Sequence, residues 1–314
     1  MHGLPALGID VGGGSAKIGL VAPDGTVIAR TQVVSNPALE GGALLDSYLN
    51  AAFALQAEIK ATKLAGIGIG LPGQIDTAAG TTYVGNVASL DGFPIVGHVR
   101  ARTGLNAAIE NDATLAAFAE HRHGAGRGSR RFLTVTLGTG IGVGFIEDGK
   151  AVHTSNGTLG DIGHVIVDPS GTRTCRQGCH GCLESVASGL ALAESFRGLG
   201  GSEPGSDGIA PLFARAAQGN AQCLHIIDQA ARFIAAGIVT WTHIFAPDRI
   251  AFAGGVSAAG PVLGDRIVAA IRGLIMPPYL ANLTFVAAEL GNDAGLVGAA
   301  AFGRGQSSTE QLVA

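Results

Sequence analysis

The chain has 314 residues, which at roughly 100 to 200 residues per domain is enough for two domains with a hydrophobic core each. Hydrophobic residues make up 47% and charged residues only 14%, against about 25% charged in ordinary globular proteins, so an intrinsically disordered chain is excluded. The net charge is −4 and no basic run could follow a phosphate backbone, which makes nucleic acid a poor partner.

The N-terminus lacks the basic and then apolar pattern of a signal peptide. The most apolar long stretch, residues 230–246, is interrupted by Arg232, Thr240, Thr242 and His243, which does not suit a membrane span. We therefore expect a cytoplasmic protein, in which cysteines stay reduced.

The chain opens with two short strands joined by a glycine turn. Residues 7–10 form an apolar run that ends at Gly12-Gly13-Gly14, and residues 17–21 form a second run that ends before Asp24-Gly25. An Asp-Gly pair after an apolar run is typical of a hairpin turn. The predicted succession is strand, glycine turn, strand and hairpin.

The same succession returns in the second half of the chain. Residues 132–136 and 141–146 are apolar runs on either side of Gly138-Thr139-Gly140, and Asp148-Gly149 follows them. An internal repeat at this distance predicts a duplicated domain.

Helices and strands alternate between the two repeats. Residues 42–60 have helical character, residues 64–70 are strand-like and end at the turn Leu71-Pro72-Gly73, and residues 106–109 lead into Glu110-Asn111-Asp112. A helical run with apolar residues on one face comes next. This alternation is typical of α/β folds.

The pattern continues toward the C-terminus. Asn220 can cap a long helix that runs to about residue 245, and a strand over residues 249–253 ends at Gly254-Gly255.

Three glycine turns, at residues 12–14, 138–140 and 254–255, each follow a predicted strand. Backbone N–H groups in such turns can form concavities for anionic phosphate, although a single glycine turn is more often only a tight turn. None of the three carries the G-x-x-x-x-G-K-[ST] or G-x-G-x-x-G motif, so the common P-loop and dinucleotide-binding folds are disfavoured.

These segments resemble the motifs of the ROK sugar kinases, a family of the actin-like ATPase superfamily that includes bacterial glucokinases. The resemblance covers nearly the whole chain. It implies the actin-like ATPase (ribonuclease H-like) fold, a duplicated two-domain α/β fold with an interdomain cleft. The segments that carry it are Gly8–Gly13 with Lys17, Thr136–Gly142, Ala253–Val256, Glu110–Ala113, Asp161–His164, Gly181–Glu184 and Asn292–Ala300.

Two domains follow from this order of segments. We predict a small α/β domain over residues 1–112 and a large α/β domain over residues 113–295, which carries a zinc loop at residues 164–182. A C-terminal helix at about residues 296–314 is expected to pack back on the small domain.

The resemblance also implies an enzyme that transfers the γ-phosphoryl group of MgATP to the 6-hydroxyl of a hexose such as glucose. The three glycine turns would bind the nucleotide, and Asp10 would orient the Mg²⁺ or its water. The implied nucleotide-binding residues are Asp10, Gly12, Gly13, Lys17, Gly138, Thr139, Gly140, Gly254 and Gly255.

Asp112 is the candidate general base. From the residues alone, Asp112 or Asn111 could simply cap the helix that follows. The resemblance implies instead that the Asp112 carboxylate accepts the proton of the sugar hydroxyl during phosphoryl transfer. The implied sugar-binding residues are Gly73, Asn111, Asp112, Asp161, His164 and Glu184.

His164, Cys175, Cys179 and Cys182 form the second candidate centre. Three thiols and one imidazole meet the four-coordinate demand of structural Zn²⁺, and a set of free thiols is the alternative. The resemblance implies zinc in this region and a contact between the other ring nitrogen of His164 and the sugar. The family usually has its second cysteine where this chain has Gln177.

Two further departures from the family concern substrate and nucleotide. Asp161 stands where the family generally has the longer Glu, and Gly14 stands where it usually has Thr. The shorter carboxylate favours, as an alternative, an amino-sugar 6-kinase that acts on N-acetylmannosamine, N-acetylglucosamine or kanosamine. Polyphosphate as the donor is disfavoured because the chain has no basic track for a long anionic polymer.

A sugar-sensing transcriptional regulator is the alternative of another class, since some relatives with this fold bind DNA. The strand at Leu7 leaves no room before it for a helix-turn-helix, and the net charge is negative. We therefore expect a kinase with a sugar and ATP as its partners, without nucleic acid or membrane. The resemblance favours a homodimer.

Overall fold

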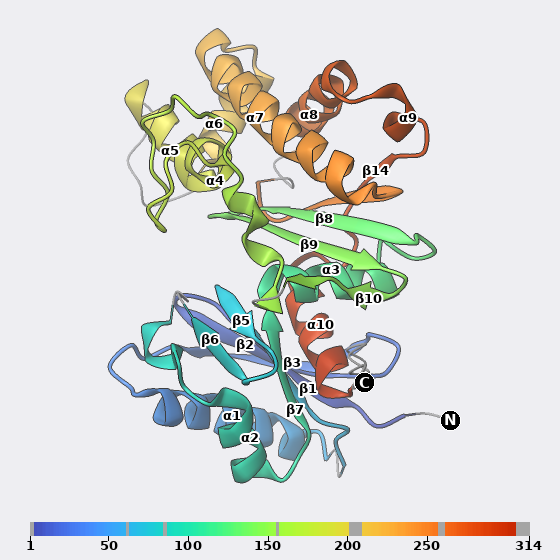
Figure 1. Ribbon diagram of the computed structural model, residues 1–314. Coiled ribbons are helices and arrows are strands. Elements are labelled where there is room, and N and C mark those ends of the chain that lie inside the picture. The colour runs from blue at the N-terminus through green and yellow to red at the C-terminus, as the bar shows by residue number, and fades with distance from the viewer. Residues whose placement is uncertain are drawn as a thin grey trace. The chain divides into compact units, whose positions relative to one another are not determined.

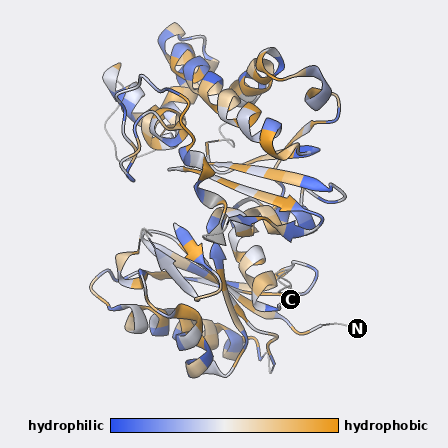
Figure 2. Cartoon of the chain, in the orientation of Figure 1, coloured by the Kyte–Doolittle hydropathy of each residue, from blue (hydrophilic) through white to orange (hydrophobic). Residues whose placement is uncertain are grey.

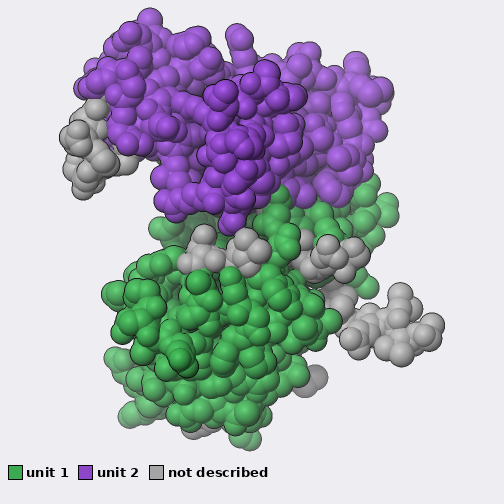
Figure 3. All heavy atoms as spheres, turned by 60° about the vertical axis from the view of Figure 1, so that its left-hand side comes forward, with its two compact units in different colours: residues 1–132, 144–161, 289–314 green, residues 133–143, 162–288 purple. Residues whose placement is uncertain are grey.

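The computed structural model describes residues 3–60, 63–83, 87–154, 157–200, 209–256 and 261–305, shown in Figure 1. Contacts divide the chain into two compact units, coloured separately in Figure 3. Unit 1 comprises residues 1–132, 144–161 and 289–314, and unit 2 comprises residues 133–143 and 162–288. The C-terminal segment therefore belongs with the N-terminal one.

Unit 1 is built on a five-stranded sheet with the strand order β3-β2-β1-β4-β7. Strand β2 is antiparallel to β1 and β3, whereas β4 is parallel to β1 and β7. The strands are β1 (Ala6–Val11), β2 (Ser15–Val21), β3 (Val27–Val34), β4 (Ile67–Leu71) and β7 (Ala107–Asn111). The shorter strands of this unit are β5 (Gln74–Asp76), β6 (Thr81–Tyr83), β10 (Lys150–Ala151), β11 (His153–Thr154) and β12 (Gly157–Thr158).

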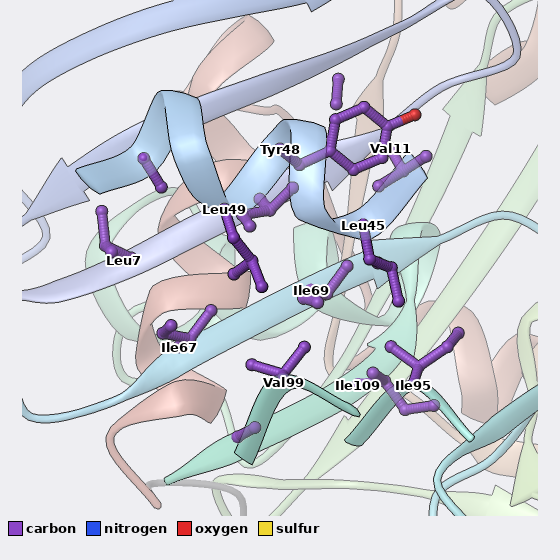
Figure 4. Close-up of a cluster of buried hydrophobic side chains, with 14 of the residues drawn as sticks. Leu7, Val11, Leu45, Tyr48, Leu49, Ile67, Ile69, Ile95, Val99 and Ile109 are labelled. Carbon is purple, nitrogen blue, oxygen red and sulfur yellow. The ribbon is translucent and has the colours of Figure 1, made fainter. Parts of the chain in front are cut away.

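The helices of unit 1 pack against both faces of this sheet. On one face, leucines and Tyr48 of α1 and two residues of α2 form a buried core with apolar residues of β1, β4 and β7, shown in Figure 4. On the other face, α10 contacts β1, β4 and β7 and also packs on α3. The helices are α1 (Gly41–Glu58), α2 (Ile95–Thr103), α3 (Asp112–His123) and α10 (Ala294–Gly303). The 3-10 turns are η1 (Ala88–Leu90) and η4 (Gly291–Asp293).

Strand β4 alternates isoleucine and glycine, and β1 has Gly8 between Leu7 and Ile9; the period of two places the glycines on one face and the large side chains on the other. Ile67 and Ile69 of β4 join the core under α1, whereas the intervening Gly68 faces α10. A Cβ on Gly68 would lie 1.7 Å from the carbonyl oxygen of Ala299, and one on Gly8 would lie 2.2 Å from that of Leu296. Only glycine therefore allows α10 to approach the sheet this closely.

A second five-stranded sheet has the order β10-β9-β8-β13-β14. If the five strands of each sheet are numbered in the order in which they occur along the chain, the order across both sheets is third, second, first, fourth and fifth. The predicted internal repeat is thereby confirmed. The additional strands are β8 (Arg131–Leu137), β9 (Ile141–Glu147), β13 (Arg249–Ala253) and β14 (Thr284–Ala287).

Both predicted Asp-Gly turns form hairpins. Gly25 has φ +89°, and the Thr26 N–H donates to Asp24 Oδ1 at 2.9 Å. Asp148 and Gly149 have φ +51° and +78°, the left-handed backbone that a two-residue hairpin of this kind needs at both positions.

The helices of unit 2 gather around one long apolar helix, α7, which contacts α4, α5, α6 and α8. As predicted, Asn220 caps α7, with its Oδ1 accepting the Cys223 N–H at 3.0 Å. The helices are α4 (Leu183–Ala187), α5 (Gly189–Gly198), α6 (Ala210–Ala217), α7 (Ala221–Phe245), α8 (Pro261–Leu274) and α9 (Pro277–Leu280). The 3-10 turn η2 (Gly160–His164) begins in unit 1 and ends in unit 2.

Helix α7 is long and apolar enough to cross a membrane by length and composition alone. However, 56% of its most apolar window is buried inside the protein, and Trp241 is 2% exposed. Figure 2 shows apolar and polar residues side by side on α7 and α8, as expected for helices with one buried face. The apolar character of α7 is thus explained by its place in the core of unit 2.

The contact boundary between the units differs from the predicted domain boundary. Helix α3 packs on α10 and counts with unit 1, so this boundary falls at residue 132 rather than at 112. The division into residues 1–112 and 113–295 stays a prediction. The expected C-terminal helix at about residues 296–314 corresponds to α10, which ends at Gly303. Residues 306–314 lie outside the described part of the chain.

Candidate active site

The junction between β7 and α3 carries the two central predicted residues. Asn111 caps α3, because its Oδ1 accepts the N–H groups of Ala113 at 3.0 Å and Thr114 at 3.1 Å. Its Nδ2 donates to the Gly73 carbonyl at 3.1 Å, so three predicted sugar-site residues meet here. Asp112 is the first residue of α3, and its Oδ1 accepts the Ala113 N–H at 2.8 Å.

Asp112 lies in an acidic environment within unit 1. Burial, followed by the negative charge of Asp10 and a smaller effect from Asp161, raises the pKa of Asp112 to about 7. Burial also raises the pKa of Asp10, and Lys17 opposes that rise. A carboxyl group with a pKa near neutrality can both take up and release a proton at working pH, as a general base must.

The first glycine turn adjoins this acidic group. Lys17 on β2 lies with its Nζ 3.8 Å from Asp10 Oδ2, and it donates to the Asn292 carbonyl at 3.3 Å. The Gly12 N–H donates to the Ser15 carbonyl at 2.8 Å and closes the turn. A Cβ on Gly13 would meet no atom within 4 Å in the described part of the chain, so the turn leaves open space at this position.

The second glycine turn lies in unit 2 and is fixed by Glu184. The Gly138 N–H donates to the Gly140 carbonyl at 3.0 Å, and Glu184 Oε2 accepts the Ile141 N–H at 3.1 Å. A Cβ on Gly140 would lie 2.4 Å from the same Glu184 oxygen. Glu184 on α4 therefore supports the turn directly, in addition to any contact with a ligand.

The third glycine turn lies beside the second. Gly254 has φ +88°, and a Cβ there would lie 2.3 Å from the Leu137 carbonyl oxygen, to which the Val256 N–H donates at 2.9 Å. Leu137 ends β8 and Gly254 follows β13, the neighbouring strand, so both turns lie at the same edge of the second sheet. Gly255, like Gly13, has open space at its Cβ position among the described residues.

The cysteine loop brings together three of its four predicted ligands. One donor atom each from His164, Cys175 and Cys182 lies within 4.8 Å of the others. His164 Nδ1 is 3.5 Å from Cys175 Sγ and 3.7 Å from Cys182 Sγ, which leaves Nε2 free to point elsewhere. The Cys179 thiol contacts Cys175 and stays outside this group of three. The donor set of two thiols and an imidazole suits Zn²⁺.

The predicted site residues are divided between the two units. The residues in unit 1 are Asp10, Gly12, Gly13, Lys17, Gly73, Asn111, Asp112 and Asp161. The residues in unit 2 are Gly138, Thr139, Gly140, His164, Cys175, Cys179, Cys182, Glu184, Gly254 and Gly255.

The prediction from sequence missed three residues beside these groups. Gly295 at the start of α10 packs on Asp10, since a Cβ there would lie 2.9 Å from the Asp10 carboxyl carbon. Glu110 and His153 form a pair next to Asn111. Glu110 and Gly295 lie inside motifs that the sequence displays, whereas nothing in the sequence marks His153.

A sequence model of the ROK family matches residues 6–305, and the chain belongs to this family. It is 32% identical to a glucokinase of Halalkalibacterium halodurans over 93% of this chain and 92% of that protein. It is 29% identical to an N-acetylmannosamine kinase of Citrobacter koseri, over 96% of this chain and 99% of that protein. Family and α/β fold class are thus confirmed.

A solved structure carries the same fold. The ROK family glucokinase of Streptomyces griseus, in complex with glucose and AMPPNP, superposes with a TM-score of 0.79 and 32% identity. The match covers 96% of this chain and 99% of that one.

Proposed function

We propose that the protein is an ATP-dependent hexose kinase that transfers the γ-phosphoryl group of MgATP to the 6-hydroxyl of a glucose-like sugar. The observation that carries the proposal is the partly buried Asp112 carboxyl at the start of α3, whose pKa of about 7 suits a general base. The chain belongs to the ROK family, and its relatives include glucokinases.

Asp112 would accept the proton of the sugar hydroxyl as its oxygen attacks the γ-phosphorus, while the phosphoryl group leaves ADP. Asn111 holds the start of α3 and the Gly73 carbonyl together, so it fixes the direction from which Asp112 meets the sugar. Asp161, His164 and Glu184 are proposed to complete the sugar site.

The nucleotide is proposed to bind the glycine turns. Gly13 and Gly255 have open space where other residues would carry a side chain, so backbone N–H groups can approach phosphate or ribose oxygens. Lys17 would add positive charge near the phosphates. Asp10 supplies the carboxylate oxygens that Mg²⁺ prefers, and bound Mg²⁺ would neutralise phosphate charge.

Zinc is proposed as a structural ion of the cysteine loop. His164, Cys175 and Cys182 would hold it, and Cys179 is the nearest candidate for the fourth ligand. Metal at Nδ1 would fix the tautomer of His164 and leave Nε2 for the sugar.

An amino-sugar 6-kinase is the second candidate, because a relative of 29% identity is an N-acetylmannosamine kinase. The shorter Asp161 leaves space beside the ring hydroxyls for a larger substituent. N-acetylmannosamine, N-acetylglucosamine and kanosamine are the sugars to test. Cytoplasmic location and assembly as a homodimer stay predictions.

A coupled ADP-release assay over glucose, mannose and the three amino sugars tests the proposal. We expect Asp112→Asn to lower kcat by about 10²- to 10⁴-fold with the preferred sugar, since general base catalysis contributes that much. The control Asp265→Asn changes an exposed aspartate on α8 and should leave kcat unchanged. A folded Asp112→Asn variant with most of its turnover would contradict the assignment, and higher turnover of an amino sugar than of glucose would favour the second candidate.

A further inference from the structure

Glu110 is a buried carboxylate directly before Asn111 and Asp112, and it is fully inaccessible to solvent. Its Oε1 accepts the Asn111 N–H at 2.8 Å. Its Oε2 lies 2.5 Å from His153 Nε2. Both oxygens are thus engaged, one by the backbone of the candidate active site and one by a titratable ring.

His153 comes from a segment that leads to another site residue. It lies on β11, which pairs with β12, and β12 is followed by η2 with Asp161 near its start. The contact of Glu110 with His153 therefore joins the segment of Asp112 to the segment of Asp161. All four residues belong to unit 1.

This connection matters because the pKa of Asp112 depends on the charge of Asp161. The negative charge of Asp161 contributes to the high pKa of Asp112, and a Coulomb interaction depends on distance. A shift of the β11–β12 hairpin relative to β7 would change both the position of Asp112 and its proton affinity.

The plain alternative is an ion pair that only stabilises the fold. A buried carboxylate needs partners, and removing one of them is strongly destabilising. Two observations go beyond that role. One Glu110 oxygen is bound to the N–H of the residue that caps α3, and its other partner, His153, is partly exposed and titratable, which a purely structural partner need not be.

We propose that Glu110 and His153 are positioning residues for phosphoryl transfer, and that protonated His153 holds Glu110, and with it the Asn111-Asp112 backbone, in the productive position. The inference rests on the proposed function, because it assigns these residues to Asp112 as the general base. Loss of the second ring proton of His153 removes the positive charge that faces the Glu110 carboxylate, and the hydrogen bond from a neutral ring is weaker than the bond between the two charged groups.

The electrostatics agree with this role. The hydrogen bond to Glu110 and the Glu110 charge raise the pKa of His153, against an opposing effect of burial. Among the charged groups of the described chain, Glu110 is the one whose charge shifts this pKa. The contact between protonated His153 and Glu110, here called the clamp, is therefore fully formed below the ordinary histidine pKa of about 6.5. It weakens as the pH rises through the raised pKa of His153.

The pH dependence of kcat for the wild-type enzyme tests the inference. Deprotonation of Asp112 gives an acid limb near pH 7, and we expect an alkaline limb where His153, whose pKa is raised by Glu110, loses its proton. His153→Gln offers only a neutral donor, so it should lose the alkaline limb and show, at every pH, a kcat near the level that the wild type reaches once His153 is neutral. His153→Leu and Glu110→Gln remove the clamp and should lower kcat about tenfold, with KM for ATP nearly unchanged.

His98→Gln is the matched control. His98 Nε2 also pairs with a carboxylate of unit 1, Asp46 at 3.0 Å, but these residues lie on α2 and α1. This variant should keep both limbs of the profile. Circular dichroism and thermal unfolding show which variants fold. If His153→Leu does not fold, the pH profile of His153→Gln still tests the inference.

Two results would overturn the inference in an active enzyme: an alkaline limb that persists in His153→Gln, or a folded His153→Leu with the wild-type kcat at every pH. A histidine titration by NMR adds a readout without turnover, in which Glu110→Gln should lower the pKa of His153. A wild-type protein that phosphorylates no sugar would instead refute the proposed function.

Discussion

The proton affinity of Asp112 is raised by burial and by two other aspartates from distant parts of unit 1. Asp10 lies one residue before the end of β1 and Asp161 lies in η2, and both negative charges favour the protonated form of Asp112. Burial acts in the same direction and is the largest cause. The repulsion between these partly buried carboxyl groups favours positive charge beside them, as Lys17 supplies near Asp10 and as the proposed Mg²⁺ would add.

The effect of Asp161 on Asp112 can be measured. Asp161→Asn removes one negative charge, so the pKa of Asp112 should fall and the acid limb of kcat should move to lower pH by about half a unit to one unit. The pH profile at saturating sugar checks this, independently of any fall in kcat from a weaker sugar contact. An acid limb that stays in place, or that moves to higher pH, would show that Asp161 does not act on Asp112 through its charge. Asp265→Asn is again the control.

At the scale of residues, the sequence marks candidate site residues but does not mark the residues that hold them in place. Asn111-Asp112 at a strand end before a helix indicates capping or catalysis, and the structure shows that Asn111 is the cap. The sequence could not indicate His153 as a partner of Glu110, because a histidine 43 positions away shares no periodic pattern with Glu110.

The contact between α10 and the first sheet is the element-scale feature that ties the C-terminus to unit 1. Glycines of β1 and β4 face α10, and isoleucines of β4 face α1. The alternation of Gly and Ile in residues 66–70 indicates a strand with two unlike faces. It does not identify the helix on the glycine face, which lies more than 220 positions later.

Gly68→Ala should therefore destabilise unit 1. The added Cβ would lie 1.7 Å from the Ala299 carbonyl oxygen, and backbone cannot move aside as a flexible side chain can. We expect a loss of about 3 kcal/mol in the free energy of unfolding, near the upper end for overpacked cores. Denaturant unfolding measures it.

Gly97→Ala in α2 is the matched control. Its Cβ position has no neighbour within 4 Å among the described residues, and its backbone is helical. Alanine there should stabilise the protein by about 0.4–1 kcal/mol. Equal midpoints for the two variants would contradict the close-packing explanation.

The whole molecule repeats one strand order in two sheets, and its helices and loops differ between the repeats. Unit 2 adds the long helix α7 and the cysteine loop, which has few long regular elements of its own between η2 and α4. A structural metal would stabilise such a loop, because ion binding favours the folded state that assembles the ligands.

Removal of metal should lower the thermal stability of the protein. We expect about one zinc ion per chain after dialysis, and exhaustive chelation should lower Tm by about 5–10 °C. Cys182→Ser should lose the metal, whereas Cys223→Ser, a buried cysteine of α7 outside the cluster, should keep it. A protein that is metal-free as isolated and insensitive to chelator would refute the zinc site. Retention of metal by Cys179→Ser would exclude Cys179 as a required ligand.

The sequence by itself determined the local elements of this protein: the strand and glycine-turn successions, the two Asp-Gly hairpins, the capped helices and the internal repeat. These follow from periodicity and from the backbone preferences of neighbouring residues, which act over a few positions. Only the tertiary structure decided which strands α10 contacts, that Asp10 and Asp161 raise the pKa of Asp112, and that Glu110 meets His153. Each of these depends on contacts between segments far apart in the chain, whose energy depends on distance and burial in space and leaves no local pattern in the sequence.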